Sequence, residues 1–249
     1  MTTFDIILLL LAGFGAGIIN AIAGGGSFLT FPALVFTGVP TIAANATSAV
    51  AVFPGYLSGA LGFLKELKTH PRRQIAILIG LSILGGVMGS LLLLVTPASV
   101  FSFVIPWLLG FATLLFAFGK QVSAWAAGRS GQGGFIGHFA TLVVCIYGGY
   151  FNGGLGIVLL ALFSALGMRD LNLMNGLKNI MSFALSGASV VTFAIAGIVV
   201  WPQAVVMMVA ATAGGFVGAK LARRMSATLV RMIVVVIGVT MTAIFWMRA

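Results

Sequence analysis

The stretch AGGGSFLTFPALVFTG, residues 23–38, decides the fold, because it ends one apolar segment and begins another that is too short to cross a membrane. Three consecutive glycines, Gly24–Gly26, disfavour continuation of a helix, and Ser27 directly after them is a suitable N-cap. The apolar segment 27–37 would reach only about 16 Å at about 1.5 Å per residue, against about 30 Å of hydrocarbon. The pattern therefore predicts a short helix that begins at a glycine turn near the middle of a bilayer.

The composition places the whole chain in a membrane. Of its 249 residues 61% are hydrophobic and only 6% are charged, whereas soluble domains carry about 25% charged residues. The net charge of +10 resides in short loops and helix ends, which is typical of topology signals, and no RNA-binding motif accompanies it. We expect a lipid bilayer and no nucleic acid as partners. One cysteine and two distant histidines are too few for a disulfide or a metal site, so we expect no metal and no cofactor.

Apolar runs between charges, prolines and glycine clusters predict ten helical segments. Eight of them are long enough to span a bilayer, and the second and the seventh, 27–37 and 156–167, are too short. The ten run approximately 4–22, 27–37, 42–64, 75–95, 98–119, 135–151, 156–167, 172–198, 203–222 and 228–247.

The two short segments occupy equivalent places in a repeat. GGGSFLTFPALVFTGVP (24–40) aligns with GGLGIVLLALFSALGMR (153–169), and NATSA (45–49) lies near NGLKN (175–179). The other anchors that keep their order are Gly38 on Gly167, Pro71 on Pro202, and GGVMG (85–89) on GGFVG (214–218). Five segments per half is an odd number, so the second half must enter the membrane upside down.

The charges of equivalent loops agree with this inversion. Loop 65–74 contains four basic residues and its counterpart 199–203 none, whereas loop 96–98 has none and its counterpart 223–227 begins with Arg223 and Arg224. Basic residues favour cytoplasmic loops. We therefore predict an all-α polytopic membrane protein of two inverted repeats, residues 1–119 and 135–249, each with one short broken helix. The linker 120–134, which carries Lys120 and Arg129, is predicted to be cytoplasmic, with both termini outside.

Broken helices in inverted repeats indicate a binding site at the midplane of the membrane. The first N–H groups of a helix lack intrahelical partners, carry partial positive charge and bind anions. The residues that we expect near an anion at the two helix starts are Gly24, Gly25, Gly26, Ser27, Asn152, Gly153 and Gly154. The alternative, that glycines only allow close helix contact, is our interpretation of Gly13, Gly15, Gly17, Gly85, Gly86 and Gly89.

Lys178 is the ionisable residue that lies farthest inside an apolar segment, which makes it a functional candidate. Asn175, Asn179 and Ser182 surround it on the predicted helix, so a cation, amides and a hydroxyl could face one oxyanion. Lys178 could instead extend to the interface or pair with Asp170. The repeat counterparts Asn45, Thr47 and Ser48 supply uncharged donors. Asn20 and Asn152, which precede the glycine turns, could either hold the broken backbone or contact a ligand.

Residues 13–52, GFGAGIINAIAGGGSFLTFPALVFTGVPTIAANATSAVAV, resemble the first-repeat signature of the TauE/SafE sulfite exporter family. The matching positions are the spaced glycines, Pro32, Leu34, Gly38, Pro40 and Ala46 to Ser48. The second repeat resembles the family in 147–168, Trp201–Pro202 and 214–225, and Ser27 stands where many members have a fourth glycine. The resemblance implies export of small sulfur-containing or organic anions such as sulfite, sulfoacetate or thiosulfate.

Absent motifs narrow the function further. No carboxylate lies in the middle of a predicted helix, and the chain has no ATPase or hydrolase motif. We expect no enzyme but a passive or gradient-coupled carrier of a small anion in the inner membrane of a bacterium, working by alternating access. A homodimer is our working assumption for so short a chain. The alternatives are a channel-like anion pore, and a non-transporting membrane subunit or enzyme of sulfur metabolism in which Cys145 reacts.

Overall fold

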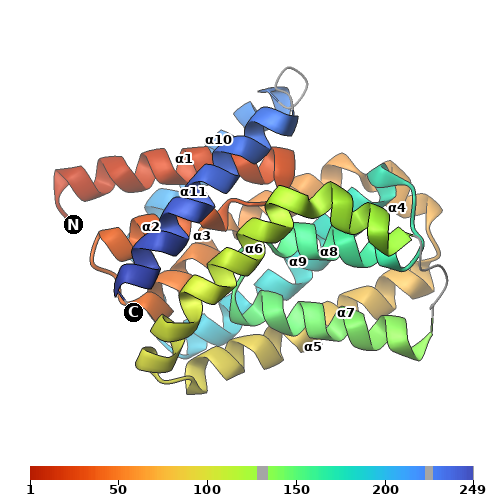
Figure 1. The fold of residues 1–249 in the computed structure, drawn as a ribbon, viewed down its shortest axis with the longest axis horizontal. Helices are drawn as coiled ribbons and strands as arrows, with labels where there is room; N and C mark the ends of the chain where they lie inside the picture. Colours follow the sequence, from red (N-terminus) through yellow and green to blue (C-terminus); the bar gives the residue numbers. More distant parts are fainter. Residues whose placement is uncertain (128–133, 222–226, 249) are drawn as a thin grey trace.

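The computed structural model describes residues 1–127, 134–221 and 227–248, and within these residues every regular element is a helix (Figure 1). The helices are α1 (Thr3–Ala23), α2 (Ser27–Phe36), α3 (Thr41–Gly62), α4 (Leu64–Thr69), α5 (Arg72–Val95), α6 (Ala98–Ala127), α7 (Phe135–Tyr150), α8 (Leu155–Ala165), α9 (Leu171–Ile195), α10 (Trp201–Leu221) and α11 (Ala227–Arg248). Both chain ends lie on the left of Figure 1, and α4 lies at the opposite end of the bundle.

The basic loop 65–74 is more ordered than we predicted. It contains a six-residue helix, α4, and α5 already begins at Arg72. His70 separates the two helices in extended conformation, with φ −85° and ψ 147°, because a residue before proline is biased away from helical angles. Helix α6 continues to Ala127 and so includes eight residues of the expected linker. Arg129, Arg223 and Arg224 lie outside the described residues, as does the side chain of Lys120.

Five helices in the described part of the chain are long and apolar enough to cross a bilayer, where we predicted eight. The five spans lie in α1, α5, α6, α9 and α10. Helix α7 has only 16 residues, because the chain turns extended at Phe151 (φ −145°, ψ 104°). The apolar part of α11 that the structure describes is Met232–Met247. Helix α3 is 22 residues long, but its first half carries Asn45, Thr47 and Ser48, all buried inside the protein.

The two short helices end in the same way. Helix α2 has 10 residues and α8 has 11, and each is followed by a left-handed glycine, Gly38 (φ 83°) or Gly167 (φ 85°). After Gly38 the Val39 N–H donates to the Leu34 carbonyl at 3.0 Å, and after Gly167 the Met168 N–H donates to the Phe163 carbonyl at 3.0 Å. Glycine is the residue that adopts this conformation without strain, and it closes the carbonyl end of a helix. The two ends thus share one backbone motif.

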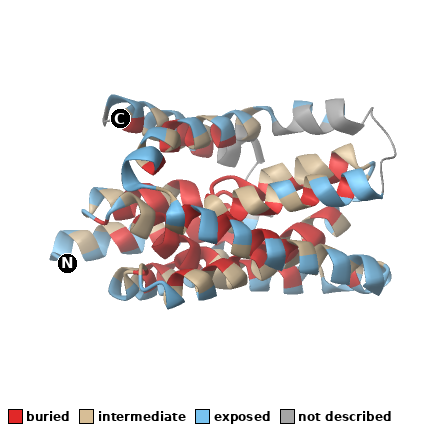
Figure 2. Cartoon of the chain, turned by 90° about the horizontal axis from the view of Figure 1, so that it is seen from below, coloured by how far each residue is buried: buried red, intermediate tan, exposed pale blue. Residues whose placement is uncertain are grey.

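Long helices pack in pairs around a buried interior, which Figure 2 shows in red. Helix α1 lies along α10, α5 along α7, α6 along α11, and α3 along α9. Glycines allow the closest of these approaches. A methyl group added at Gly17 would collide with the Ala211 carbonyl, and one added at Gly89 would collide with the Ile146 carbonyl. The predicted role of the glycines in close helix contact is confirmed for Gly13, Gly17, Gly85, Gly86 and Gly89, while Gly15 faces the side chain of Leu29.

Candidate functional site

The first broken helix leaves backbone donors at the start of α2. Helix α1 ends where the Gly24 N–H donates to the carbonyls of Asn20 and Ile19, and α2 begins at Ser27. The prediction that Ser27 caps this helix is wrong: Gly26 holds the N-cap position and makes no side-chain capping bond. Within the described chain, the N–H groups of Gly25, Gly26 and Ser27 have no protein acceptor, as expected for a helix start.

The glycine turn between α1 and α2 meets the first turn of α8 at Lys178. A Cβ placed on Gly24 would lie 3.5 Å from the Gly156 Cα and 3.6 Å from the Lys178 Nζ. A Cβ placed on Gly156 would lie 3.2 Å from the Lys178 Cδ and 3.3 Å from the Gly24 carbonyl oxygen. Three segments that are distant in sequence therefore converge on one point. A side chain at 156 would crowd the lysine, whereas a methyl group at 24 would be in ordinary contact with it.

Lys178 is buried and forms no ion pair with a described carboxylate. Its side chain is 6% exposed, and its Nζ donates to the Asn175 Oδ1 at 3.1 Å. Asp170 accepts the backbone N–H groups of Asn172 and Leu173 and thereby caps α9. Among the described residues no carboxylate contacts Lys178, so neither the pairing with Asp170 nor an extension to the interface is observed. A cation buried without a counter-charge is costly, and an anion would relieve that cost.

Ser182 extends this polar face by one helical turn. It lies four residues after Lys178 on α9, is 1% exposed, and its hydroxyl has no hydrogen-bond partner. Its neighbours on the same face define where it points, because residues four apart on a helix share a face. Lys178 contacts Gly156, and the Ser186 Oγ accepts the Asn152 Nδ2 at 3.4 Å. Ser182 therefore lies between these two contacts on the face of α9 that packs against the start of α8.

The start of α8 is held by a network that sequence reasoning missed. The Tyr56 hydroxyl donates to the Asn152 Oδ1 at 3.2 Å, and the Tyr147 hydroxyl donates to the Gly153 carbonyl at 2.6 Å. Gly154 then adopts φ 71° as the N-cap of α8, which begins at Leu155. Asn152 therefore holds broken backbone in place, which was one of its two predicted roles. The partners Tyr56, Tyr147 and Ser186 come from other turns and helices, so no local sequence signal marks them.

Asn20, which precedes the first glycine turn, makes fewer hydrogen bonds than Asn152 does before the second. Asn20 lies next to Gly26 and Gly55, since a Cβ added at either glycine would lie 3.2 Å from an atom of its side chain. Its Oδ1 is buried without a hydrogen-bond partner. The two breaks of the chain thus differ: side chains clamp the second, whereas the first retains an unsatisfied amide oxygen.

Four predicted residues make contacts elsewhere. The Asn45 Nδ2 donates to the Tyr150 carbonyl at 2.9 Å, and the Thr47 Oγ1 accepts the Val200 N–H at 3.0 Å. The Ser48 and Thr30 hydroxyls hydrogen-bond at 2.6 Å. Asn179 packs against Gly59 of α3, because adjacent helical residues such as Lys178 and Asn179 do not share a face. The structure brings Gly24, Asn175 and Lys178 together, and uses these four residues to join α3 to its neighbours.

Comparison with known proteins gives one family. The family model described as Sulfite exporter TauE/SafE matches residues 9–245. A Haemophilus influenzae protein described as "Probable membrane transporter protein" is 31% identical over 243 residues, which covers 95% of this chain and 92% of the relative. A protein of Escherichia coli K12 described as "Probable membrane transporter protein YfcA" is 25% identical over 228 residues, covering 92% and 84%. No solved structure matches the chain.

Proposed function

Because the chain belongs to the sulfite exporter TauE/SafE family, whose members are membrane transporters, we propose that it exports small oxyanions across the bacterial inner membrane. Sulfite, sulfoacetate and anions of similar size are the substrate class. The observation that carries this proposal is the meeting of Gly24, Gly156 and Lys178 inside the bundle.

The donors around this point fit a pyramidal or tetrahedral oxyanion. The unpaired N–H groups of Gly25, Gly26 and Ser27 lie at the start of α2, where the helix dipole adds partial positive charge. Lys178 supplies a full charge, and the Ser182 hydroxyl supplies one further donor. An oxyanion offers several lone pairs at once, and hydrogen bonds to charged groups are shorter and stronger than those between neutral groups. A neutral solute of the same size would leave the lysine uncompensated.

Helix packing supports an inverted-repeat arrangement for the transporter. Suppose that a two-fold operation relates α1, α2, α3, α5 and α6 to α7, α8, α9, α10 and α11, respectively. The contact between α1 and α10 then maps onto the contact between α7 and α5, and both contacts are present. The contact between α5 and α9 likewise maps onto the contact between α10 and α3, and the contact between α3 and α9 maps onto itself. At this last contact Phe53 stacks on Phe183, its repeat counterpart, with ring centroids 4.7 Å apart and planes 11° apart. An approximate two-fold axis through this pair accounts for all of these contacts.

Alternating access follows from such an arrangement. Each half contributes one short helix to the site, so rocking one half against the other would expose the same donors first to one side and then to the other. Loop 65–74 and the linker that precedes α7 are both predicted to be cytoplasmic. The packing agrees with placing them on one side, because His70 and His138 line one cavity at one end of the bundle. We assign that end to the cytoplasm.

Transport by purified protein in liposomes tests the proposal. We expect sulfite loaded inside to exchange for external sulfite, with saturation and counterflow, and Lys178→Met to abolish the exchange. Lys178→Arg retains the charge and should retain part of the flux, while Lys65→Met, which removes an exposed charge from α4, is the matched control. Wild-type exchange in Lys178→Met would remove the lysine from the mechanism, and flux without saturation or counterflow would favour a pore.

A further inference from the structure

A second binding feature lies away from the anion site. A cavity of about 560 Å³ opens where α5 and α7 begin and α8 ends. Its walls are almost wholly apolar and include the buried side chains of Phe163 and Leu177 and the half-buried side chains of Leu78 and Leu166. Gly24, Gly156 and Lys178 are not among the described residues that line it, so its occupant need not be the transported anion.

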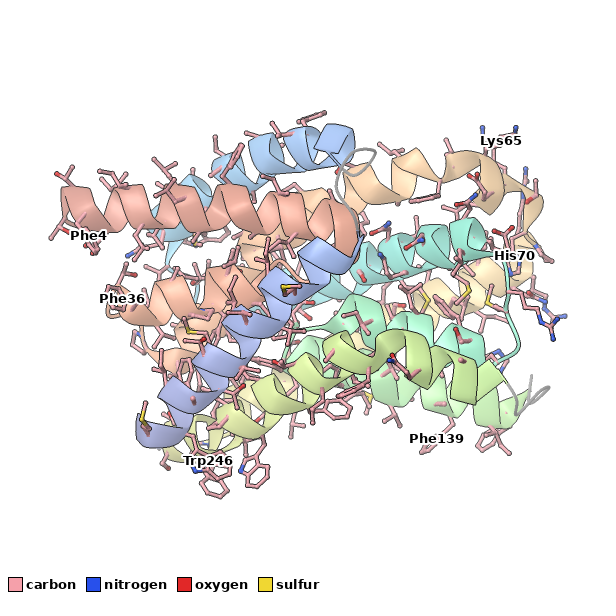
Figure 3. All side chains as sticks on the ribbon, turned by 45° about the horizontal axis from the view of Figure 1, so that its top comes forward. Phe4, Phe36, Lys65, His70, Phe139 and Trp246 are labelled. Carbon is pink, nitrogen blue, oxygen red and sulfur yellow. The ribbon has the colours of Figure 1, made fainter. Side chains whose placement is uncertain are left out.

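The mouth of the cavity is basic. Arg73, His70 and His138 line it, and no acidic side chain is among its described lining residues. Arg73 and His138 are exposed at the first turns of α5 and α7, where their side chains can reach an anion outside the cavity. Figure 3 shows His70 at the same end of the molecule as Lys65 and Phe139. An apolar interior below a cationic rim fits a ligand with an apolar tail and an anionic head.

Exposed apolar side chains suited to contact with lipid lie beside the rim of the cavity. Phe135, Ile136 and Phe139 surround His138 in the first turn of α7 and are 85%, 61% and 59% exposed. Such side chains are stable when they contact acyl chains rather than water, whereas Arg73 and His138 suit the headgroup region. Basic pockets between helices on the cytoplasmic side are suited to anionic lipid heads. The cavity therefore opens at the boundary between acyl chains and headgroups.

We propose that this cavity binds one anionic phospholipid, with its phosphate at Arg73 and His138 and one acyl chain between Leu78, Leu166 and Phe163. A zwitterionic lipid would offer the same tail, but its head would place a second cation beside Arg73. The preference for anionic lipid is thus a property of the rim, and retention of the lipid is a property of the apolar walls.

Native mass spectrometry of the purified transporter tests both parts, using phosphatidylglycerol and phosphatidylcholine of equal chain length. We expect phosphatidylglycerol to be retained preferentially, and Arg73→Ala to weaken its binding about fivefold. Arg72→Ala is the matched control, because Arg72 is the adjacent exposed arginine and does not line the cavity. Leu166→Trp, which narrows the cavity and leaves the rim intact, should weaken the binding of both lipids.

Equal weakening by Arg72→Ala and Arg73→Ala would overturn the proposal, because it would mean that diffuse surface charge attracts the lipid. Equal retention of the two lipids, or unchanged binding in Leu166→Trp, would overturn it as well. Displacement of the lipid by inorganic phosphate at the same concentration would assign the rim to a free anion instead. None of these results depends on transport of sulfite, so the proposed function can fail or hold independently.

Discussion

Replacing Ser182 distinguishes most clearly between a role of its hydroxyl in anion binding and a role in fold stability. It is buried and has no partner in the protein, and such a group costs about 1–3 kcal/mol of stability. Replacing Ser182 by alanine removes that cost and leaves the neighbouring backbone unchanged. We therefore expect the ligand-free variant to melt at the same temperature as the wild type or higher, by about 2–4 °C per kcal/mol.

The same substitution should weaken anion binding. A hydrogen bond to a charged group contributes about 1.5–3 kcal/mol, which corresponds to a roughly 10-fold to 100-fold rise in Kd. Isothermal titration calorimetry with sulfite would measure this change, and a thermal melt without sulfite would measure stability. Ser182→Thr retains the hydroxyl and should recover part of the affinity.

Ser189→Ala is the matched control. Ser189 is two turns farther along α9, is 2% exposed, and donates its hydroxyl to the Gly86 carbonyl at 3.2 Å. Its loss should leave a buried carbonyl weakly satisfied, lower the melting temperature and leave the Kd for sulfite unchanged. If Ser182→Ala instead lowered the melting temperature while sulfite bound with wild-type affinity, the hydroxyl would be structural and the reasoning would be refuted.

Two further predictions concern glycines, each with a control in the same chain. Gly24→Ala and Gly38→Ala both force alanine into left-handed backbone (φ 80° and 83°), and each variant should lose about 1–2 kcal/mol of folding stability. Only Gly24→Ala places a methyl group beside Lys178, so only this variant should stop sulfite exchange. Equal sulfite exchange in the two variants would contradict this prediction. Gly89→Ala should lower the melting temperature sharply, because its methyl group meets the Ile146 carbonyl. Gly80→Ala on the same helix meets open space and should maintain or raise the melting temperature, because alanine favours a helix more than glycine does. Similar melting temperatures for the two variants would argue against close packing of α5 on α7.

The chain breaks were predictable from sequence because their causes are local. Gly24, Gly38, Gly154 and Gly167 all occupy left-handed positions that other residues avoid. Lys178 was predictable because a charge inside an apolar segment is rare. Each of these features can be recognised within a few residues of sequence.

The residues that contact these glycines and Lys178 could not be predicted, because they are brought there by tertiary packing. Gly156 has no signal of its own, yet it is the residue that meets both Gly24 and Lys178. Asn45 seemed equivalent to Asn175 in the repeat, but it bonds the carbonyl of Tyr150 at the end of α7. Whether a buried amide holds backbone or faces a ligand depends on which helix end lies opposite, and spacing along one helix does not contain that information.

The most direct test of the central claim is to locate a bound oxyanion. Selenite has the pyramidal shape and charge of sulfite, and its selenium gives an anomalous X-ray signal. Crystals of the transporter soaked in selenite should show one anomalous peak beside the contact between Gly24 and Gly156, with oxygens about 2.7–3.2 Å from the Lys178 Nζ and from the N–H groups that begin α2. A selenium peak elsewhere in the bundle, with Lys178 still bonded only to Asn175, would contradict the claim.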